Sequence, residues 1–267
     1  MSDEPSVPEI TGFLVELARI AGNAILPHFR TSVAIEDKGG KRFDPVTIAD
    51  REAERVLRAA IAARYPTHGI LGEEFGEQAG TAPYRWIIDP IDGTRAFVSG
   101  LPTWGTLVAL CEGPRPLFGL MAQPWVGECF IGSPGGAVWQ RAEVTRSLSS
   151  RPTAELADAT LFATAPEMFD AREWTRFDAL SRATRMTRYG ADCYAYCLLA
   201  AGHVDLVVEA GLGFYDIAAL VPIVEGAGGV VTHWDGAPIS AGGRVVAAAN
   251  RQLHARALTY LRDAGHG

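Results

Sequence analysis

The sequence lacks the features of nucleic-acid-binding, secreted and membrane proteins. Its only lysines are Lys38 and Lys41, and its formal net charge is −7 with a pI near 5.4. An acidic chain without a dense basic run does not suit a polyanionic surface, so no nucleic-acid partner is expected. No apolar run is long enough to span a bilayer, and the first residues lack the basic and apolar regions of a signal peptide. These absences predict a cytoplasmic protein with no membrane partner.

Ligands for soft metals and motifs for nucleotides are also scarce. The four cysteines show no zinc-ribbon spacing and the six histidines are scattered, so a zinc hydrolase is not favoured. Cys193 and Cys197 lie one helical turn apart and are predicted to be a reduced, buried pair. There is no P-loop, and neither Gly211–Gly213 nor Gly226–Gly229 fits the G-x-G-x-x-G pattern of a dinucleotide site.

The stretch Trp86–Thr94 is the one around which the chain is organised. Its apolar start predicts a short buried strand that ends at Asp89, and Pro90 then interrupts regular strand pairing. Asp92 follows three residues later, and Gly93 can adopt a positive φ ahead of a helix. Two carboxylates at a strand end, beside a helix start, suit a Mg²⁺ ion that carries a phosphate. On this stretch alone, an Asp-Gly turn between two hairpin strands is the alternative.

Other carboxylates occupy comparable positions. A helix is predicted to begin near Thr47 with Asp50 in its first turn, where interaction with the helix dipole is the alternative role of that residue. A short strand over Ile70–Gly72 delivers Glu73 to its end. Asp216 follows a glycine-rich loop and opens a further apolar run. The chain therefore supplies several carboxylates at element ends, which is where a site can be built.

Apolar periodicity predicts an α/β chain with a run of strands in its middle. Helices are expected over residues 8–27, 47–64, 167–181, 192–201 and 253–262, and strands of an antiparallel meander over 106–110, 116–123, 127–131 and 137–140. Further strands are expected over 204–208, 229–232 and 245–249, and Pro222 is expected to kink or break the run after Asp216. The polar stretch Arg146–Pro152 predicts a boundary between an N-terminal half, residues 1–146, and a C-terminal half, residues 147–267.

Four motifs in register make the sequence resemble the inositol monophosphatase family. They are Val46–Asp50, Gly72-Glu73-Glu74, Asp89-Pro90-Ile91-Asp92-Gly93-Thr94, and Tyr215–Leu220 followed by Glu225–Gly229. Tyr215 stands where many members carry Trp, which leaves the neighbouring aspartate intact. The resemblance implies a layered αβαβα sandwich of the inositol monophosphatase and fructose-1,6-bisphosphatase type, and a homodimer.

The resemblance also implies a magnesium site, residue by residue. Glu73, Asp89 and the backbone carbonyl of Ile91 match the ligands of one Mg²⁺. Asp89, Asp92 and Asp216 match those of a second, so that Asp89 bridges the two ions. A third, weaker Mg²⁺ would contact Glu73 through water.

Asp50 and Thr94 match the family's pair that orients the attacking water, together with Glu73. Gly93 and Thr94 would meet the phosphate. Two metal ions can clamp the attacking and leaving oxygens of an in-line displacement, and phosphoryl transfer asks for little beyond positioning and charge neutralisation. The implied activity is a Mg²⁺-dependent phosphomonoesterase acting on a small-molecule ester. A non-catalytic metal- or phosphate-binding module would use the same ligands and is the alternative.

The stretch Arg188–Cys197 carries the prediction of the substrate. Inositol-specific members resemble Gly-Ser-Ala-Ala here, whereas this chain has Asp192 and bulkier neighbours. Together with Arg95–Pro102, this stretch is similar to the histidinol-phosphate phosphatases of the same superfamily. Histidinol phosphate, an intermediate of histidine biosynthesis, is therefore the expected substrate, and inositol or another polyol phosphate is the alternative.

Three residues are predicted to contact the leaving group, which is cationic in histidinol phosphate. They are Asp192, Arg188 and Glu209, the last expected at the end of the strand over 204–208. An N-cap is the alternative role of Asp192, and a solvated strand end is that of Glu209. The glycines and charges of Glu36–Asp44 further predict a mobile loop that closes over the site when metal and substrate bind.

Overall fold

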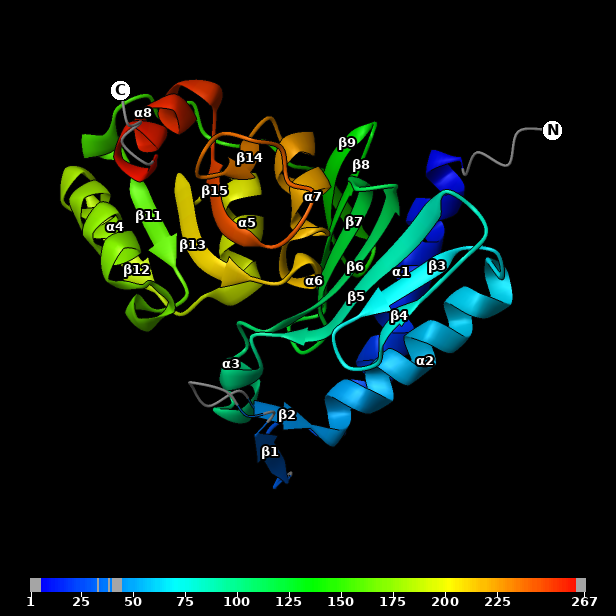
Figure 1. Ribbon diagram of the computed structural model, residues 1–267. Helices are drawn as coiled ribbons and strands as arrows, with labels where there is room; N and C mark the ends of the chain where they lie inside the picture. Colours follow the sequence, from blue (N-terminus) through cyan, green and yellow to red (C-terminus); the bar gives the residue numbers. More distant parts are fainter. Residues whose placement is uncertain (1–5, 33, 38, 40–44, 263–267) are drawn as a thin grey trace.

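Helices and sheets alternate in the order αβαβα, which confirms the predicted fold class (Figure 1). The computed structural model describes residues 6–32, 34–37, 39 and 45–262. Three clusters of buried apolar side chains fill the four interfaces between the five layers, because one cluster covers both faces of the middle helices. Each layer therefore buries its apolar side chains against its neighbour, and the carboxylates at element ends collect where the middle layers meet.

The first layer is a pair of helices that covers one face of the first sheet. Apolar residues at helical spacing, from Ile10 to Ile25 and from Ala49 to Ile61, form the buried faces of these helices. The helices are α1 (Val7–Ile25) and α2 (Ile48–Arg64). The helix α2 begins next to Thr47, close to where it was predicted, and the Thr47 hydroxyl caps it by accepting a hydrogen bond from the Ala49 N–H. A small antiparallel ladder, β1 (Ile35–Asp37) with β2 (Pro45–Thr47), precedes α2.

The first sheet has the strand order β10-β9-β8-β7-β6-β5-β3-β4. Its strands are β3 (Gly69–Gly72), β4 (Gly76–Gln78), β5 (Tyr84–Asp92), β6 (Gly105–Glu112), β7 (Arg115–Gln123), β8 (Glu128–Ser133), β9 (Gly136–Arg141) and β10 (Val144–Ser147). The run from β5 to β10 is antiparallel, which confirms the predicted meander, whereas β3 lies parallel to β5. Because β3 and β5 are parallel, their carboxyl ends reach the same edge of the sheet.

The second sheet has the order β12-β11-β13-β15-β14. Its strands are β11 (Thr160–Ala163), β12 (Met186–Tyr189), β13 (Leu206–Leu212), β14 (Val230–His233) and β15 (Gly243–Ala248). Two helices, α4 (Ala171–Ala183) and α8 (Arg251–Leu261), cover its outer face through the third apolar cluster. The strands β10, β11 and β12 were not predicted. The glycine-rich loop predicted over residues 211–215 is also wrong except at Gly213, because β13 runs to Leu212 and a short helix begins at Phe214.

Three short helices lie between the sheets (Figure 1). They are α5 (Asp192–Ala200), α6 (Phe214–Ile217) and α7 (Leu220–Gly226). The interruption predicted near Pro222 falls instead between α6 and α7, and Pro222 sits in the first turn of α7, where no N–H partner is lost. Cys193 and Cys197 are free thiols buried on α5, as predicted.

One sequence prediction falls partly outside the described residues, and another is not tested by the structure. Of Glu36–Asp44, residues 38 and 40–44 are not described, whereas residues 36 and 37 belong to β1 and are not a loop. The division into halves at residue 146 stays a prediction; β10 ends the first sheet at Ser147 and β11 begins the second at Thr160. Over the described ranges, no helix combines the length and apolarity needed to cross a bilayer.

Candidate metal centre

A bulge in β5 brings two aspartates to one side of the chain. Asp89 is opposite Leu107 on β6, whereas Asp92 is opposite Gly105, so three steps along β5 correspond to two along β6. Residues three apart on a regular strand face opposite sides, and one extra residue restores them to the same side. Pro90, which has no N–H to donate, lies in this bulge, and its carbonyl accepts a hydrogen bond from the Thr106 hydroxyl at 2.8 Å.

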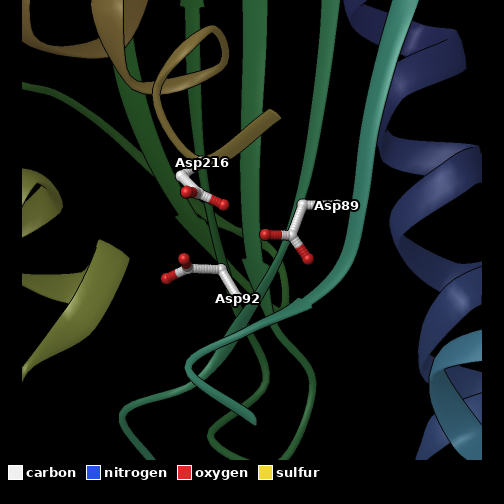
Figure 2. A group of neighbouring side chains, drawn as sticks. All are labelled: Asp89, Asp92 and Asp216. Carbon is white, nitrogen blue, oxygen red and sulfur yellow. The ribbon is translucent and has the colours of Figure 1, made fainter. Parts of the chain in front are cut away.

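Asp216 completes a cluster of three carboxylates with Asp89 and Asp92. It lies on α6, and its Oδ2 accepts from the Gly213 N–H at 2.7 Å. One oxygen of each carboxylate lies within 4.8 Å of the others. Figure 2 shows the side chains of Asp89 and Asp216 pointing toward one another, with that of Asp92 next to them. The structure thus brings together, from two distant parts of the sequence, three residues that the sequence predicted as metal ligands.

Glu73 and Asp50 lie next to this cluster. The Glu73 N–H donates to the Ile88 carbonyl at 3.2 Å, which places Glu73 directly after β3 and beside Asp89. Its charge contributes to raising the pKa values of Asp89 and Asp50. Asp50 is only 1% exposed, and its Oδ2 accepts from both the N–H and the hydroxyl of Thr47. Asp50 therefore closes the cap of α2, and it lies near enough to Glu73 for that carboxylate to contribute to its raised pKa.

The turn after β5 holds the predicted phosphate-binding residues. Gly93 has φ +83°, a left-handed conformation that favours glycine. The Thr94 hydroxyl donates to the Ile91 carbonyl at 3.1 Å. Because this hydroxyl gives its proton to the backbone, its oxygen is left to accept a hydrogen bond from a further group, such as a water. The roles of Gly93, Thr94 and the Ile91 carbonyl in binding stay predictions.

The electrostatics of the cluster call for a cation. Burial raises the pKa of Asp92 to about 8 and that of Asp216 to about 7, and neighbouring carboxylates contribute to both shifts. Burial, and then the charges of Glu73, Asp92 and Asp216, hold the pKa of Asp89 well above its ordinary value. Carboxylates crowded in this way are stabilised by a divalent cation, and an all-oxygen donor set suits Mg²⁺. The residues therefore fit the metal that the sequence predicted.

These pKa shifts predict how the stability of the metal-free protein depends on pH. The folded-state pKa values of Asp92 and Asp216 lie above the ordinary value of 3.8, so the folded chain holds protons that the unfolded chain has lost. The melting temperature measured in chelator is therefore expected to fall by about 5 °C or more between pH 5.5 and pH 8.5. Mg²⁺ should remove most of this loss, and Asp92→Asn should flatten the metal-free profile. A metal-free melting temperature that rises over this range would contradict the assignment.

Sequence reasoning missed Glu54, which holds the turn that carries Glu73. Glu54 is fully buried on α2, and its carboxylate accepts from the N–H groups of Glu74 at 2.7 Å and Phe75 at 3.2 Å. Arg58, one helical turn on, donates to the same carboxylate at 2.7 Å. The signal in the sequence was the spacing of four residues between Asp50 and Glu54, which places both on one face of α2.

Asp192 lies over the turn after β5. A Cβ added to Gly93 would stand 3.0 Å from the Asp192 Cβ and Cγ. Burial raises the pKa of Asp192 to about 8, the charges of Asp92 and Glu209 add to this, and Arg95 opposes it. The N-cap alternative for Asp192 is wrong, because it is the first residue of α5 with φ +46° and no side chain caps that helix.

The other two predicted substrate residues lie on the second sheet. Glu209 is inside β13 and 3% exposed, so both the predicted strand end and the solvated alternative are wrong. Its carboxylate accepts from the N–H and hydroxyl of Thr164 and from the Tyr196 hydroxyl. Arg188 is exposed on β12. The contacts of Glu209 and Arg188 with a substrate stay predictions.

Comparison with known proteins decides the family. The chain matches the inositol monophosphatase family over residues 6–266. It belongs to that family. The resemblance seen in the four motifs is thereby confirmed, and this inositol monophosphatase family member is a phosphoric monoester hydrolase. Members of the family generally use Mg²⁺, in agreement with the carboxylate cluster.

Relatives within the inositol monophosphatase family have several names. The chain is 39% identical over 256 residues to the chloroplastic bifunctional phosphatase IMPL2 of Arabidopsis thaliana, covering 92% of this chain and 72% of the relative. It is 36% identical over 260 residues to the histidinol-phosphatase of Streptomyces coelicolor, covering 92% and 94%. Among solved structures, an inositol monophosphatase from Zymomonas mobilis superposes with a TM-score of 0.86 at 40% identity, covering 96% of this chain and 99% of that one.

Proposed function

We propose that this phosphatase hydrolyses histidinol phosphate with Mg²⁺ and an activated water, and so serves histidine biosynthesis. The observation that carries the proposal is Asp192, a carboxylate placed over the turn after β5 and beside the carboxylate cluster. Relatives named histidinol-phosphatase support it, at 36% identity for that of Streptomyces coelicolor and 35% for that of Chlorobaculum parvum.

The charge around Asp192 favours a cationic leaving group. After burial, the negative charges of Asp92 and Glu209 raise the pKa of the Asp192 carboxyl group. The positive charge of Arg95 lowers it. An inositol leaving group carries only hydroxyls, whereas histidinol carries an ammonium and an imidazole. A carboxylate that accepts a hydrogen bond from an ammonium contributes about 1.5–3 kcal/mol. Glu209, whose carboxylate accepts hydrogen bonds from the hydroxyl groups of Thr164 and Tyr196, adds negative charge to the same region.

The reaction follows from the positions of the residues. Glu73, Asp89, Asp92, Asp216 and the Ile91 carbonyl would hold the Mg²⁺ ions. Bound Mg²⁺ supplies charge neutralisation on the phosphate and lowers the pKa of a bound water. Thr94, whose hydroxyl proton is engaged by Ile91, accepts a hydrogen bond from the attacking water, and Asp50 fixes the other side of that water. Gly93 lets the backbone approach the phosphate.

The remaining assignments belong to the same proposal. Two Mg²⁺ ions are used, with a third bound more weakly near Glu73. Arg188 contacts the substrate from β12, and the protein acts as a cytoplasmic homodimer. No nucleic acid or membrane takes part.

The test is a comparison of two substrates in Asp192→Asn. Because Asn keeps the shape and loses the charge, kcat/KM for histidinol phosphate is expected to fall about tenfold, or ~1.4 kcal/mol. The rate with glycerol phosphate, a neutral ester, should hardly change. Phosphate release is measured at saturating Mg²⁺ for both esters and for inositol phosphate. Equal losses on both esters, or a wild-type preference for inositol phosphate, would instead favour an inositol phosphatase, the name carried by the Zymomonas mobilis structure.

A further inference from the structure

A cavity with a buried carboxylate, which none of the predicted metal ligands lines, lies against one side of α5. We call it the α5 cavity. It has a volume of about 430 Å³, which suits one small organic molecule. Its walls come from β8, β9, the segment after β9 and α5, chiefly Glu128, Phe130, Trp139, Arg146, Tyr194 and Leu198.

Glu128 provides the charge of the α5 cavity. The residue is 8% exposed, and its two oxygens accept from the Tyr194 hydroxyl and, at 2.6 Å, from the Trp139 indole N–H. Both donors are neutral, so they satisfy hydrogen bonds without pairing the negative charge; Arg146 and His203 also line the cavity. In the part of the chain that the structure describes, Glu128 forms no ion pair. A buried carboxylate is stabilised when a cation pairs with it.

The walls of the cavity are suited to a cation with an apolar body. Phe130 and Tyr194 pack edge to face with ring centroids 5.9 Å apart. The Arg146 guanidinium lies 5.5 Å from the centre of the Trp139 ring, so this wall already attracts a cation from the protein's own surface. Arg146 is exposed and lines the cavity, and its guanidinium stacks on Trp139 instead of pairing with Glu128.

We propose that the α5 cavity binds a small organic cation. Its ammonium or imidazolium group pairs with Glu128, and its apolar body packs against Phe130, Trp139 and Leu198. Carboxylate and aromatic faces together are the combination by which proteins recognise organic ammonium ions.

The same residues connect the cavity to the metal centre. Tyr194, which donates to Glu128, follows Cys193, and the Cys193 N–H donates to Asp92 Oδ2 at 2.8 Å. A ligand that pairs with Glu128 therefore changes the hydrogen bond from Tyr194, and with it the first turn of α5, which contacts the predicted metal ligand Asp92. Because such coupling is reciprocal, bound cation is expected to change the Mg²⁺ concentration for half-maximal activity a few-fold.

The test uses benzylammonium as the probe and benzyl alcohol as its neutral counterpart. Titration calorimetry on the Mg²⁺-loaded full chain is expected to show benzylammonium binding in the millimolar range or tighter, at least tenfold tighter than the alcohol. Glu128→Gln should weaken benzylammonium binding at least tenfold, and Asp192→Asn should not. Leu198→Trp, which adds bulk to the cavity wall and leaves Glu128 unchanged, should also block binding, so the proposal can still be tested if the Glu128 variant misfolds. Arg146→Ala should bind as tightly as wild type or more tightly.

Three results would overturn the proposal. Benzylammonium that binds neither wild type nor Arg146→Ala would leave Glu128 without a ligand. Equal affinity for the alcohol would reduce the α5 cavity to an apolar space. Binding kept in Glu128→Gln and lost in Asp192→Asn would place the cation in the catalytic pocket. Binding without any change in the Mg²⁺ requirement would overturn the connection through Tyr194.

Discussion

Replacing Asp89 with Asn is expected to lower kcat/KM by at least about hundredfold, or ~2.7 kcal/mol. Asp89 is the member of the cluster whose pKa responds to the charges of Glu73, Asp92 and Asp216, so it lies among all of them. In the family's arrangement it is shared between two metal ions, and a neutral amide cannot supply charge to both. The measurement is phosphate release over a range of Mg²⁺ concentrations.

The stability of the same variant separates loss of metal from loss of fold. Asp89→Asn removes one charge from a buried cluster of like charges, so the metal-free variant is expected to melt at or above the wild-type temperature near pH 8. The increase in melting temperature that Mg²⁺ gives wild type should be largely lost. Asp178→Asn is the control, because Asp178 lies on the outer helix α4 in an ion pair with Arg182. Activity within tenfold of wild type in Asp89→Asn would contradict the bridging role.

The ligands were predictable because they occupy the ends of elements that the sequence marks clearly. The apolar run that opens β5 leads to Asp89 and a proline, and α2 starts at a threonine with an aspartate three residues on. The prediction that the strand ends at Asp89 is wrong, because β5 continues through a bulge to Asp92. Asp89 and Asp50 could be placed from these signals alone. The assembly of Asp216 with Asp89 and Asp92 could not, since no local pattern connects residues over a hundred positions apart. The resemblance to the family supplied that step.

What the sequence did not predict depends on packing between distant segments. Strand β12 is mostly exposed and β11 is four residues long, so neither offers a hydrophobic period that distinguishes a strand from a loop. Glu209 was predicted at a strand end because it follows the strand expected over residues 204–208. Inside β13 it is satisfied by Thr164 and Tyr196, whose contribution appears only when α5 packs beneath the sheet. Buried polar residues of this kind are invisible to patterns of hydrophobicity.

Glu54 is expected to fix the position of Glu73, and metal binding is therefore expected to depend on both residues. Glu54 holds the two N–H groups that follow Glu73, and the side of Gly72 facing it is closely packed. A Cβ added to Gly72 would stand 2.0 Å from Glu54 Oε1, so one of the two must move. Glu54 is therefore a positioning residue, which acts on the metal through the turn that carries Glu73.

Gly72→Ala is accordingly expected to lower kcat/KM by about hundredfold, because a displacement of about 1 Å at a reacting site costs that much. Glu54→Gln removes the negative charge that strengthens the three hydrogen bonds accepted by this side chain. It should raise the Mg²⁺ concentration for half-maximal activity about tenfold, or ~1.4 kcal/mol. Activity and melting temperature are measured across a Mg²⁺ titration. Gly12→Ala on α1 is the matched control, since nothing lies within 4 Å of the Cβ it would add.

A double substitution distinguishes positioning from a general loss of stability. If the methyl group added by Gly72→Ala acts only by displacing the Glu54 carboxylate, then Glu54→Ala makes room for it, and the two substitutions together should cost much less than the sum of their separate effects. Full additivity would mean that the two residues act independently. A lower melting temperature with an unchanged Mg²⁺ requirement in both single variants would assign Glu54 a structural role alone. We expect the opposite, because the carboxylate is bonded to the very amides that set where Glu73 points.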